Sequence, residues 1–205
     1  MPTLKLTYFD SPGRAEPIRI ALRVAGIPFE DIRLKFPGFA EARARGEFPL
    51  GSVPMLEIDG VKIVQTAAIL RYVARIGDRS LYPDDAWKAL LVDSALDTFN
   101  DTLSHALLPS LFERDHDKKL AMRAELAAGP LARAYGYVEG LIAQSGGPFV
   151  AGATMSIADL VVAAGALQIQ SGHLDGLNAA HLAAFPRVLA LAEAYRRDPR
   201  IAALG

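Results

Sequence analysis

Residues 48–66 read Phe-Pro-Leu-Gly-Ser-Val-Pro-Met-Leu-Glu-Ile-Asp-Gly-Val-Lys-Ile-Val-Gln-Thr. Val53 precedes a proline, which favours an extended backbone, and Pro54 has no N–H to donate, so it suits a strand entrance. Asp59-Gly60 is typical of a type I′ turn between two short strands. After Gln65-Thr66, apolar residues recur with helical periodicity. The segment therefore predicts a proline-fronted hairpin and then a helix whose N-terminus is capped by a hydroxyl residue.

This local structure has features that suit a small ligand. An extended backbone at Val53 can offer its N–H and C=O to a peptide-like molecule, as an added strand does. The helix start at Gln65-Thr66 offers free N–H groups and a positive dipole end to a carboxylate. We place the two features at opposite ends of the strand pair, so that they converge only if the fold brings them together. The alternative for such a motif alone is a purely structural hairpin with a capped helix.

The first part of the chain alternates between strand and helix patterns. Apolar and polar residues alternate over residues 3–9, and residues 14–25 carry an apolar helical face that Gly26 closes. Residues 29–34 form a second strand, and an irregular segment connects it to the hairpin. The order strand, helix, strand, irregular segment, hairpin, helix predicts an α/β sandwich of thioredoxin type.

The rest of the chain shows helical patterns only. Residues 79–83 read as a linker, and from Ala86 onward there is no convincing strand. Residues 118–145 form a long helical stretch that Gly129-Pro130 interrupts. Ser156 and Asp159 have the spacing of a capping box and open a very apolar helix. We therefore predict an α/β thioredoxin-like N-terminal domain at residues 1–78 and an all-α helical C-terminal domain at residues 86–205.

Composition narrows the class of protein. The 205 residues are 51% hydrophobic and 22% charged, with a formal net charge of −1, so neither nucleic acid nor a membrane is expected as a partner. The N-terminus has no signal-peptide pattern, which makes a cytoplasmic location the expectation. The absence of cysteine excludes disulfides and a cysteine nucleophile, and the four dispersed histidines have no metal-ligand spacing, so we expect no metal.

Several motifs together resemble the glutathione S-transferases. Val53-Pro54, Asp59-Gly60 and Gln65-Thr66 are similar to that family's glutathione-binding half, and the strings at residues 5–9 and 13–19 are similar to its tyrosine-type Sigma class. The resemblance covers the whole chain and implies the same two-domain fold. It also implies a cis Val53-Pro54 bond, contact of Val53 with the cysteinyl backbone of glutathione, and contact of Gln65 and Thr66 with its γ-glutamyl carboxylate.

The resemblance assigns the chemistry to Tyr8 and Arg14. A free thiol has a pKa of about 8.5, so little thiolate exists at neutral pH. A phenol stays protonated there and can donate a hydrogen bond to sulfur, which favours the thiolate and lowers the thiol pKa. A positive charge at Arg14 would favour the thiolate further. The nucleophile then belongs to glutathione, which suits a protein without cysteine.

Further residues are implied at the glutathione site. Arg43 keeps a charge for the glycyl carboxylate, Phe39 replaces a tryptophan and lacks its N–H donor, and Ser52 is a shorter donor than the residue common at its place. Asp101 would cross a dimer interface to the γ-glutamyl amine, so that a two-fold homodimer follows. Asn100 stands where related Sigma-class proteins have the middle one of three cation-binding aspartates, which argues against the same metal effect.

The expected function is conjugation of glutathione to a hydrophobic electrophile, in detoxification. The second substrate should meet Tyr8 between the two halves, against Phe9, Pro12, Gly13, Ser104, His105 and Leu108. Glutathione-dependent isomerisation or peroxide reduction would use the same thiolate. The rival from another class is a non-catalytic binding protein on the same fold, and a cysteine-type thiol-exchange enzyme is disfavoured by the lack of cysteine.

Overall fold

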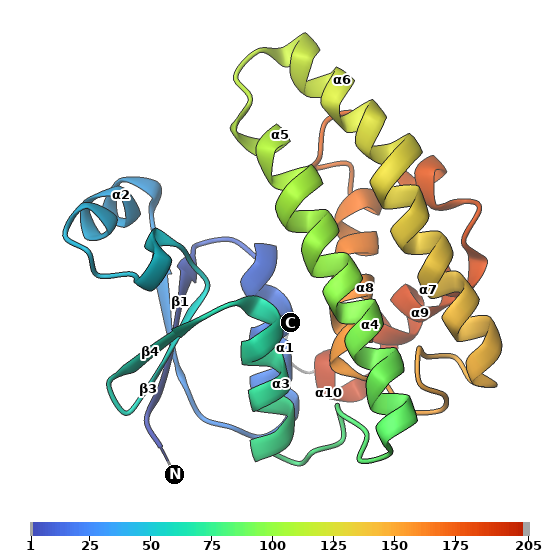
Figure 1. Ribbon diagram of the computed structural model, residues 1–205, viewed down its shortest axis with the longest axis horizontal. Helices are drawn as coiled ribbons and strands as arrows, with labels where there is room; N and C mark the ends of the chain where they lie inside the picture. Colours follow the sequence, from blue (N-terminus) through green and yellow to red (C-terminus); the bar gives the residue numbers. More distant parts are fainter. Residues whose placement is uncertain (1, 203–205) are drawn as a thin grey trace. The chain divides into compact units, whose positions relative to one another are not determined.

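The computed structural model describes residues 2–202 and divides them into two compact units, with the boundary between Arg79 and Ser80 (Figure 1). The first unit contains a sheet with helices, and the second is helical. Within the described residues, no helix combines the length and the apolar character needed to cross a membrane.

Unit 1 is built on a four-stranded sheet in the order β2-β1-β3-β4. The central strand β1 (Leu4–Phe9) runs parallel to β2 (Glu30–Leu34) and antiparallel to β3 (Met55–Ile58), which pairs with β4 (Val61–Val64). Helices α1 (Glu16–Val24) and α3 (Thr66–Ile76) pack side by side against the sheet (Figure 1). This is the predicted thioredoxin-type arrangement, so the expected fold class of the first domain is confirmed.

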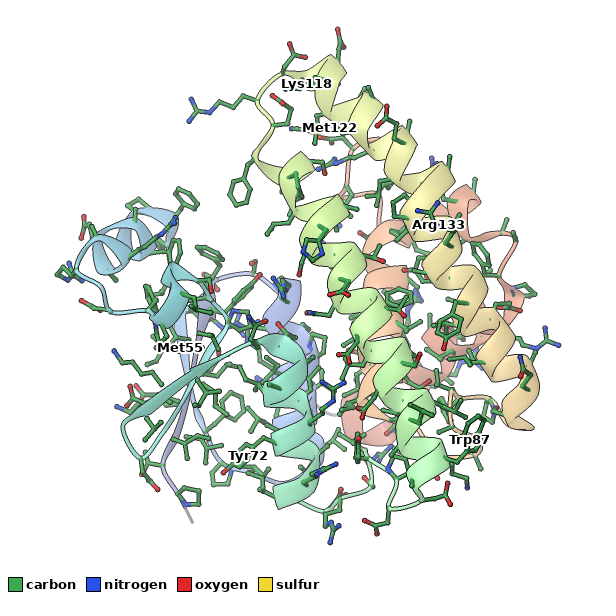
Figure 2. All side chains as sticks on the ribbon, in the orientation of Figure 1. Met55, Tyr72, Trp87, Lys118, Met122 and Arg133 are labelled. Carbon is green, nitrogen blue, oxygen red and sulfur yellow. The ribbon has the colours of Figure 1, made fainter. Side chains whose placement is uncertain are left out.

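The core of unit 1 lies between the sheet and these two helices. Alternate residues of β1 and the apolar faces of α1 and α3 meet there, as the periodicities predict. Met55, buried at the start of β3, belongs to a second, smaller cluster beside α2 (Figure 2). The fully buried aliphatic side chains include Leu6, Ile18, Leu22, Leu56, Ile69 and Leu70.

The segment expected to be irregular contains a helix. Helix α2 (Phe36–Ala44) follows β2, and a 3-10 turn, η2 (Pro49–Gly51), comes before the hairpin. Pro37 and Gly38 are signals of a loop in the sequence, but Pro37 lies in the first helical turn, where its missing N–H costs nothing. Another 3-10 turn, η1 (Gly13–Ala15), leads into α1.

The hairpin forms as predicted, and its register corrects one expectation. Asp59 and Gly60 have φ of 48° and 88°, as a type I′ turn requires. Met55 pairs with Val64, which places the entrance of β3 and the exit of β4 at the same open end of the hairpin. The expectation that the two ligand-binding features lie at opposite ends was wrong, because the tight turn folds the second strand back along the first.

The expected hydroxyl cap of α3 was also wrong. The N-cap residue is Gln65, with φ of 86° and no side-chain capping hydrogen bond, and Thr66 is the first helical residue. The hydroxyl therefore lies one position too late to cap the helix.

Unit 2 contains only helices and loops within its described residues, apart from one isolated bridge between Phe149 and Gly152. This confirms the all-α fold class. Its helices are α4 (Ala86–Thr102), α5 (Leu108–Phe112), α6 (His116–Leu126), α7 (Ala132–Ser145), α8 (Ile157–Gln170), α9 (Pro186–Arg197) and α10 (Pro199–Ala202), with a 3-10 turn, η5 (Ala179–Leu182). Asp85 caps α4 by accepting a hydrogen bond from the N–H of Lys88, 2.9 Å away.

Two long helical segments change from α-helical to π-helical hydrogen bonding near a proline. The π-helical segment η3 (Leu103–Leu107) joins α4 to α5 just before Pro109, and η4 (Ala127–Leu131), which contains Pro130, joins α6 to α7. A proline removes one N–H donor, and a π-helical turn is one way for a helix to continue past it.

Helix α8 is buried and opens with the predicted capping box. The Asp159 carboxylate accepts hydrogen bonds from the N–H of Ser156 at 2.8 Å, from its hydroxyl at 2.6 Å and from the N–H of Val150 at 3.0 Å. The fully buried carboxylate thus fixes both the helix start and the preceding loop.

Candidate functional site

Tyr8 lies near the end of β1, where its ring is buried and the following loop covers its hydroxyl. The side chain is 8% exposed, and the Tyr8 Oη atom accepts a hydrogen bond from the backbone N–H of Arg14 at 3.2 Å. Gly13 has φ of 44°, and a Cβ there would lie 2.7 Å from Oη. The loop can pass so close to the phenol only because residue 13 has no side chain.

Arg14 occupies the 3-10 turn η1 beside this hydroxyl. Partial burial lowers the pKa of its guanidinium, while the electrostatic interaction with Tyr8 acts in the opposite direction. Because the ordinary pKa of arginine is above 12, the group keeps its positive charge at neutral pH. A cation therefore lies in the neighbourhood of the phenol, as the resemblance implies.

The bond between Val53 and Pro54 is cis, as the resemblance implies. Sheet pairing on this strand begins at Met55, so the backbone of Val53 lies outside the ladder at the open end of the hairpin. Its N–H and C=O are therefore available to an extended, peptide-like ligand. Ser52, just before it, has extended backbone and an exposed side chain.

Gln65 and Thr66 lie at the same open end of the hairpin, because β4 ends at Val64. Thr66 is 5% exposed, and its Oγ1 atom has no hydrogen-bond partner among the described residues. A buried hydroxyl without a partner is costly, and the free N–H groups of the α3 start lie in the same turn. The donors at this helix end fit a ligand carboxylate.

Phe39 and Arg43 lie one turn apart on α2. The Phe39 ring packs between Phe9 and Phe48, with centroid distances of 5.0 Å and 5.3 Å, so it is mainly part of an aromatic cluster. Arg43 is exposed, and its Nε lies 3.0 Å from the point where a Cβ on Gly51 would be. Arg43 thus lies over the loop that leads to Val53, with its charge accessible.

The residues expected around the electrophile belong to two separate sets. Phe9, Pro12 and Gly13 lie in unit 1, at the end of β1 and in the loop that follows it. Phe9 meets the Tyr8 ring edge-on at 5.3 Å, and Gly13 lies against the Tyr8 hydroxyl. Ser104, His105 and Leu108 lie in unit 2, where α4 passes through η3 into α5. His105 is exposed, and its Nδ1 lies 3.1 Å from the backbone carbonyl of Asp101, whose carboxylate is also on the surface.

One residue near Tyr8 was missed by the sequence reasoning. Arg19 is completely buried, and its guanidinium lies 5.9 Å from the centroid of the Tyr8 ring. Glu16 and Arg23 lie three and four residues from Arg19 on the same helix face, so the sequence pattern is typical of an exposed arginine and contained no signal of its burial. Within residues 2–202 there is no group of three or more side chains that could hold a metal ion.

Both units match models of known protein families. The model "Glutathione S-transferase, N-terminal domain" matches residues 4–75, and the model "Glutathione S-transferase, C-terminal domain" matches residues 100–204. The chain belongs to the glutathione S-transferase family. This confirms the predicted family, fold class and kind of enzyme, with glutathione as co-substrate.

Individual glutathione S-transferases agree with this assignment. Glutathione S-transferase 1 of Ascaris suum is 34% identical over 167 residues, which cover 79% of this chain and 78% of that protein. The structure of prostaglandin synthase D of Nilaparvata lugens has a TM-score of 0.83 and 28% identity, covering 98% of this chain and 96% of that one. Monomeric Na-GST-3 from Necator americanus has a TM-score of 0.78 and 29% identity, covering 98% and 95%.

Proposed function

We propose that this glutathione S-transferase conjugates the glutathione thiolate to hydrophobic electrophiles, with the thiolate stabilised by Tyr8. The thiol loses its proton to solvent, the sulfur lone pair forms a bond to an electrophilic carbon, and a leaving group or an adjacent unsaturated bond takes up the electron pair. The observation that carries the proposal is the hydrogen bond from the Arg14 N–H to the Tyr8 hydroxyl oxygen.

This hydrogen bond orients the Tyr8 hydroxyl group. Because its oxygen accepts from the backbone, the phenolic proton is left to be donated to another acceptor. A thiolate placed there receives a charge-assisted hydrogen bond, which is stronger than one between neutral groups. The nearby Arg14 charge favours the anion as well. The protein thus raises the fraction of reactive thiolate and holds it in place.

We assign the binding of glutathione to the open end of the hairpin and to α2. The Val53 backbone would pair with the cysteinyl residue, and the Thr66 hydroxyl and Gln65 would bind the γ-glutamyl carboxylate. Arg43 can grip the glycyl carboxylate with two hydrogen bonds. Ser52 and the Phe39 ring would border the peptide, and Pro54 fixes the strand entrance beside it.

We propose that residues 1–78 form the glutathione-binding domain and that residues 86–205 supply much of the electrophile site. The contacts would come from Phe9, Pro12 and Gly13, and from Ser104, His105 and Leu108. Detoxification in the cytoplasm stays a prediction of the sequence.

We also propose that the enzyme is a homodimer in which Asp101 completes the partner's glutathione site. Trp87, Leu90, Ser94, Asp97 and Asp101 are spaced by three and four residues and share one face of α4. Trp87 and Leu90 are 66% and 57% exposed on that face. Figure 2 labels Trp87 near the start of α4. Exposed apolar side chains next to acidic groups suit a second copy of the chain. The hookworm relative Na-GST-3 is monomeric, so the oligomeric state of this chain is the first quantity to measure.

Subunit complementation tests the shared site. Tyr8→Phe and Asp101→Ala subunits, each weakly active alone, are coexpressed with different tags and purified as the mixed dimer. One site of that dimer keeps both Tyr8 and Asp101, so its activity should return toward half of the wild-type value. A mixed species no more active than the average of its parents, or a monomer in sedimentation, would reject the proposal.

A second candidate reaction is glutathione-dependent isomerisation. The observation that favours it is the similarity to the solved prostaglandin synthase D, which also supports a Sigma-like grouping. The same thiolate would attack the substrate and be released again, so that glutathione is not consumed. Counting glutathione thiols before and after turnover separates the two reactions.

The first experiment is an ultraviolet difference titration of glutathione bound to the wild-type enzyme and to Tyr8→Phe. A bound-thiol pKa well below the free value, raised again in the variant, is the expected result. Glutathione that binds without forming thiolate would favour a non-catalytic binding protein instead.

A further inference from the structure

We infer that Arg19 is a positioning residue for the Tyr8 hydroxyl, acting through the loop that carries Gly13 and Arg14. The inference rests on the proposed function, because it concerns how the hydroxyl is held for the thiolate. The evidence for the inference is the set of contacts that the Arg19 guanidinium makes, all of them within unit 1.

The guanidinium of Arg19 is fixed by two carboxylates. Its Nε donates to both oxygens of Asp31 at 3.1 Å, and its Nη1 lies 3.2 Å from Glu16 Oε2. The arginine side chain is completely buried, and Asp31 is largely buried. A buried cation needs such partners, since leaving one unpaired is strongly unfavourable. These ion pairs therefore hold the guanidinium at one place between α1 and β2.

The two terminal nitrogens of the Arg19 guanidinium also donate to the loop that follows β1. Nη1 donates to the carbonyl oxygens of Ser11 at 2.9 Å and Pro12 at 3.3 Å, and Nη2 donates to that of Phe9 at 3.4 Å. One planar side chain thus binds three backbone carbonyls of the turn, a geometry that lysine with its single ammonium group does not reproduce.

This turn leads directly to the groups that surround the Tyr8 hydroxyl. Gly13 and Arg14 follow Pro12, and Arg14 supplies the N–H that binds Tyr8 Oη. The guanidinium also lies 5.9 Å from the centroid of the Tyr8 ring, within the range of a cation–π contact. Arg19 therefore contacts both the tyrosine ring and the loop that binds the tyrosine hydroxyl.

The test compares Arg19→Lys with Arg33→Gln. Arg33 also forms an ion pair with Asp31, at 3.0 Å, and a second one with the exposed side chain of Asp10, at 3.4 Å. Because Arg33 is exposed and binds none of the three loop carbonyls, it is the control for the loss of a cation beside Asp31. For each variant, the pKa of the bound glutathione thiol, kcat, the KM for glutathione and the thermal midpoint are measured. Tyr8→Phe is measured in parallel.

In Arg19→Lys, we expect the pKa of the bound thiol to rise by about one unit and kcat at neutral pH to fall about tenfold, because a small misplacement of a catalytic group is costly. The KM for glutathione should change less than about threefold, since Val53, Thr66 and Arg43 are not held by this loop. Arg33→Gln should leave the bound-thiol pKa and kcat unchanged.

Other results would overturn the inference. A lower thermal midpoint in Arg19→Lys with an unchanged bound-thiol pKa would make Arg19 a purely structural residue. If Arg19→Lys does not fold, Asp31→Asn replaces it as the test variant. This substitution weakens the ion pair that holds the Arg19 guanidinium and keeps the shape of the Asp31 side chain. An unchanged bound-thiol pKa in Asp31→Asn overturns the inference, and a raised one supports it. Failure of the proposed function is separate: it is shown by Tyr8→Phe leaving the thiol pKa unchanged.

Discussion

The backbone N–H of Arg14 and the hydroxyl oxygen of Tyr8 are 3.2 Å apart and hydrogen-bonded. The bond joins the end of β1 to the turn before α1, so the position of the hydroxyl depends on the path of the loop between them. It also leaves the phenolic proton as a donor. Removing the proton donor and displacing the loop should therefore both weaken the stabilisation of the glutathione thiolate.

Tyr8→Phe removes the donor and keeps the ring. We expect kcat to fall about a hundredfold, as when one donor is removed from a preorganised anion site, while glutathione still binds. The measurement is steady-state conjugation of an aromatic electrophile together with binding of glutathione by calorimetry. An unchanged kcat would show that Tyr8 does not stabilise the thiolate.

Gly13→Ala displaces the loop without touching the donor. A Cβ at this position would lie 2.7 Å from Tyr8 Oη, and the backbone has φ of 44°. We expect kcat to fall at least tenfold, because misplacement of a catalytic group is costly. Gly26→Ala is the control, since Gly26 has φ of 67° but nothing within 4 Å of an added Cβ. It should lose stability only, and equal losses of kcat in the two variants would contradict the prediction.

Thr66→Val removes a buried hydroxyl that has no partner among the described residues. We expect the KM for glutathione to rise about tenfold, because a hydrogen bond to a carboxylate is lost. The free energy of unfolding of the glutathione-free protein should change by less than about 1 kcal/mol. Ser110→Ala is the control, because it removes a buried hydroxyl that is hydrogen-bonded within the protein.

The Ser110 hydroxyl donates to the carbonyl of Leu107 at 2.8 Å and accepts from Arg123 Nε at 3.3 Å. Its loss should cost about 1 kcal/mol of stability and leave the KM for glutathione unchanged. Chemical unfolding and kinetics on both variants check the pair. A stable Thr66→Val variant with a normal KM would remove Thr66 from the glutathione site.

The parts of the fold that sequence predicted well are fixed by local chemistry. The turn at Asp59-Gly60 needs two residues that accept positive φ, and the start of α8 needs the Ser156–Asp159 spacing. Helix α2 was missed because Pro37 and Gly38 also fit a loop, and only a helix in which Pro37 lies in the first turn removes the conflict.

The parts of the site that sequence did not predict depend on residues distant in the chain. Arg19 has the appearance of a surface residue until β2 brings Asp31 to it. The open end of the hairpin was misplaced because the register, with Met55 opposite Val64, decides which residues are neighbours. Residue types predicted the chemistry of Tyr8, but the loop geometry that directs its hydroxyl required the structure.

Tyr135→Phe tests a buried hydroxyl in unit 2. The Tyr135 Oη atom has no partner among the described residues, burial raises the pKa of the phenol, and the ring borders an apolar cavity of about 10 Å³. Because an unpaired buried hydroxyl is costly, the variant should be as stable as wild type or up to about 1 kcal/mol more stable. Urea unfolding measures it.

Tyr82→Phe is the control for this prediction. The Tyr82 hydroxyl donates to Asp93 at 2.8 Å, so this variant should lose about 1 kcal/mol or more of stability. A comparable loss in Tyr135→Phe would mean that its hydroxyl has a partner in solution, such as a water molecule in the cavity.

Asp159 should make stability depend on pH. Burial raises the pKa of this carboxyl to about 6, although hydrogen bonds from the Ser156 hydroxyl and the N–H groups of Val150 and Ser156 oppose the rise. The folded state then binds the proton more tightly than the unfolded chain, whose carboxyl has its ordinary pKa of 3.8. This stabilisation is fully present below the unfolded pKa and is lost as the pH rises through the folded one. Asp159→Asn removes the titration, so the stability of wild type relative to the variant should fall between about pH 4 and pH 7. Urea unfolding of both proteins across this range measures the difference between their free energies of unfolding. A difference that is constant or increases with pH would show that the hydrogen bonds affect the Asp159 pKa more than burial does.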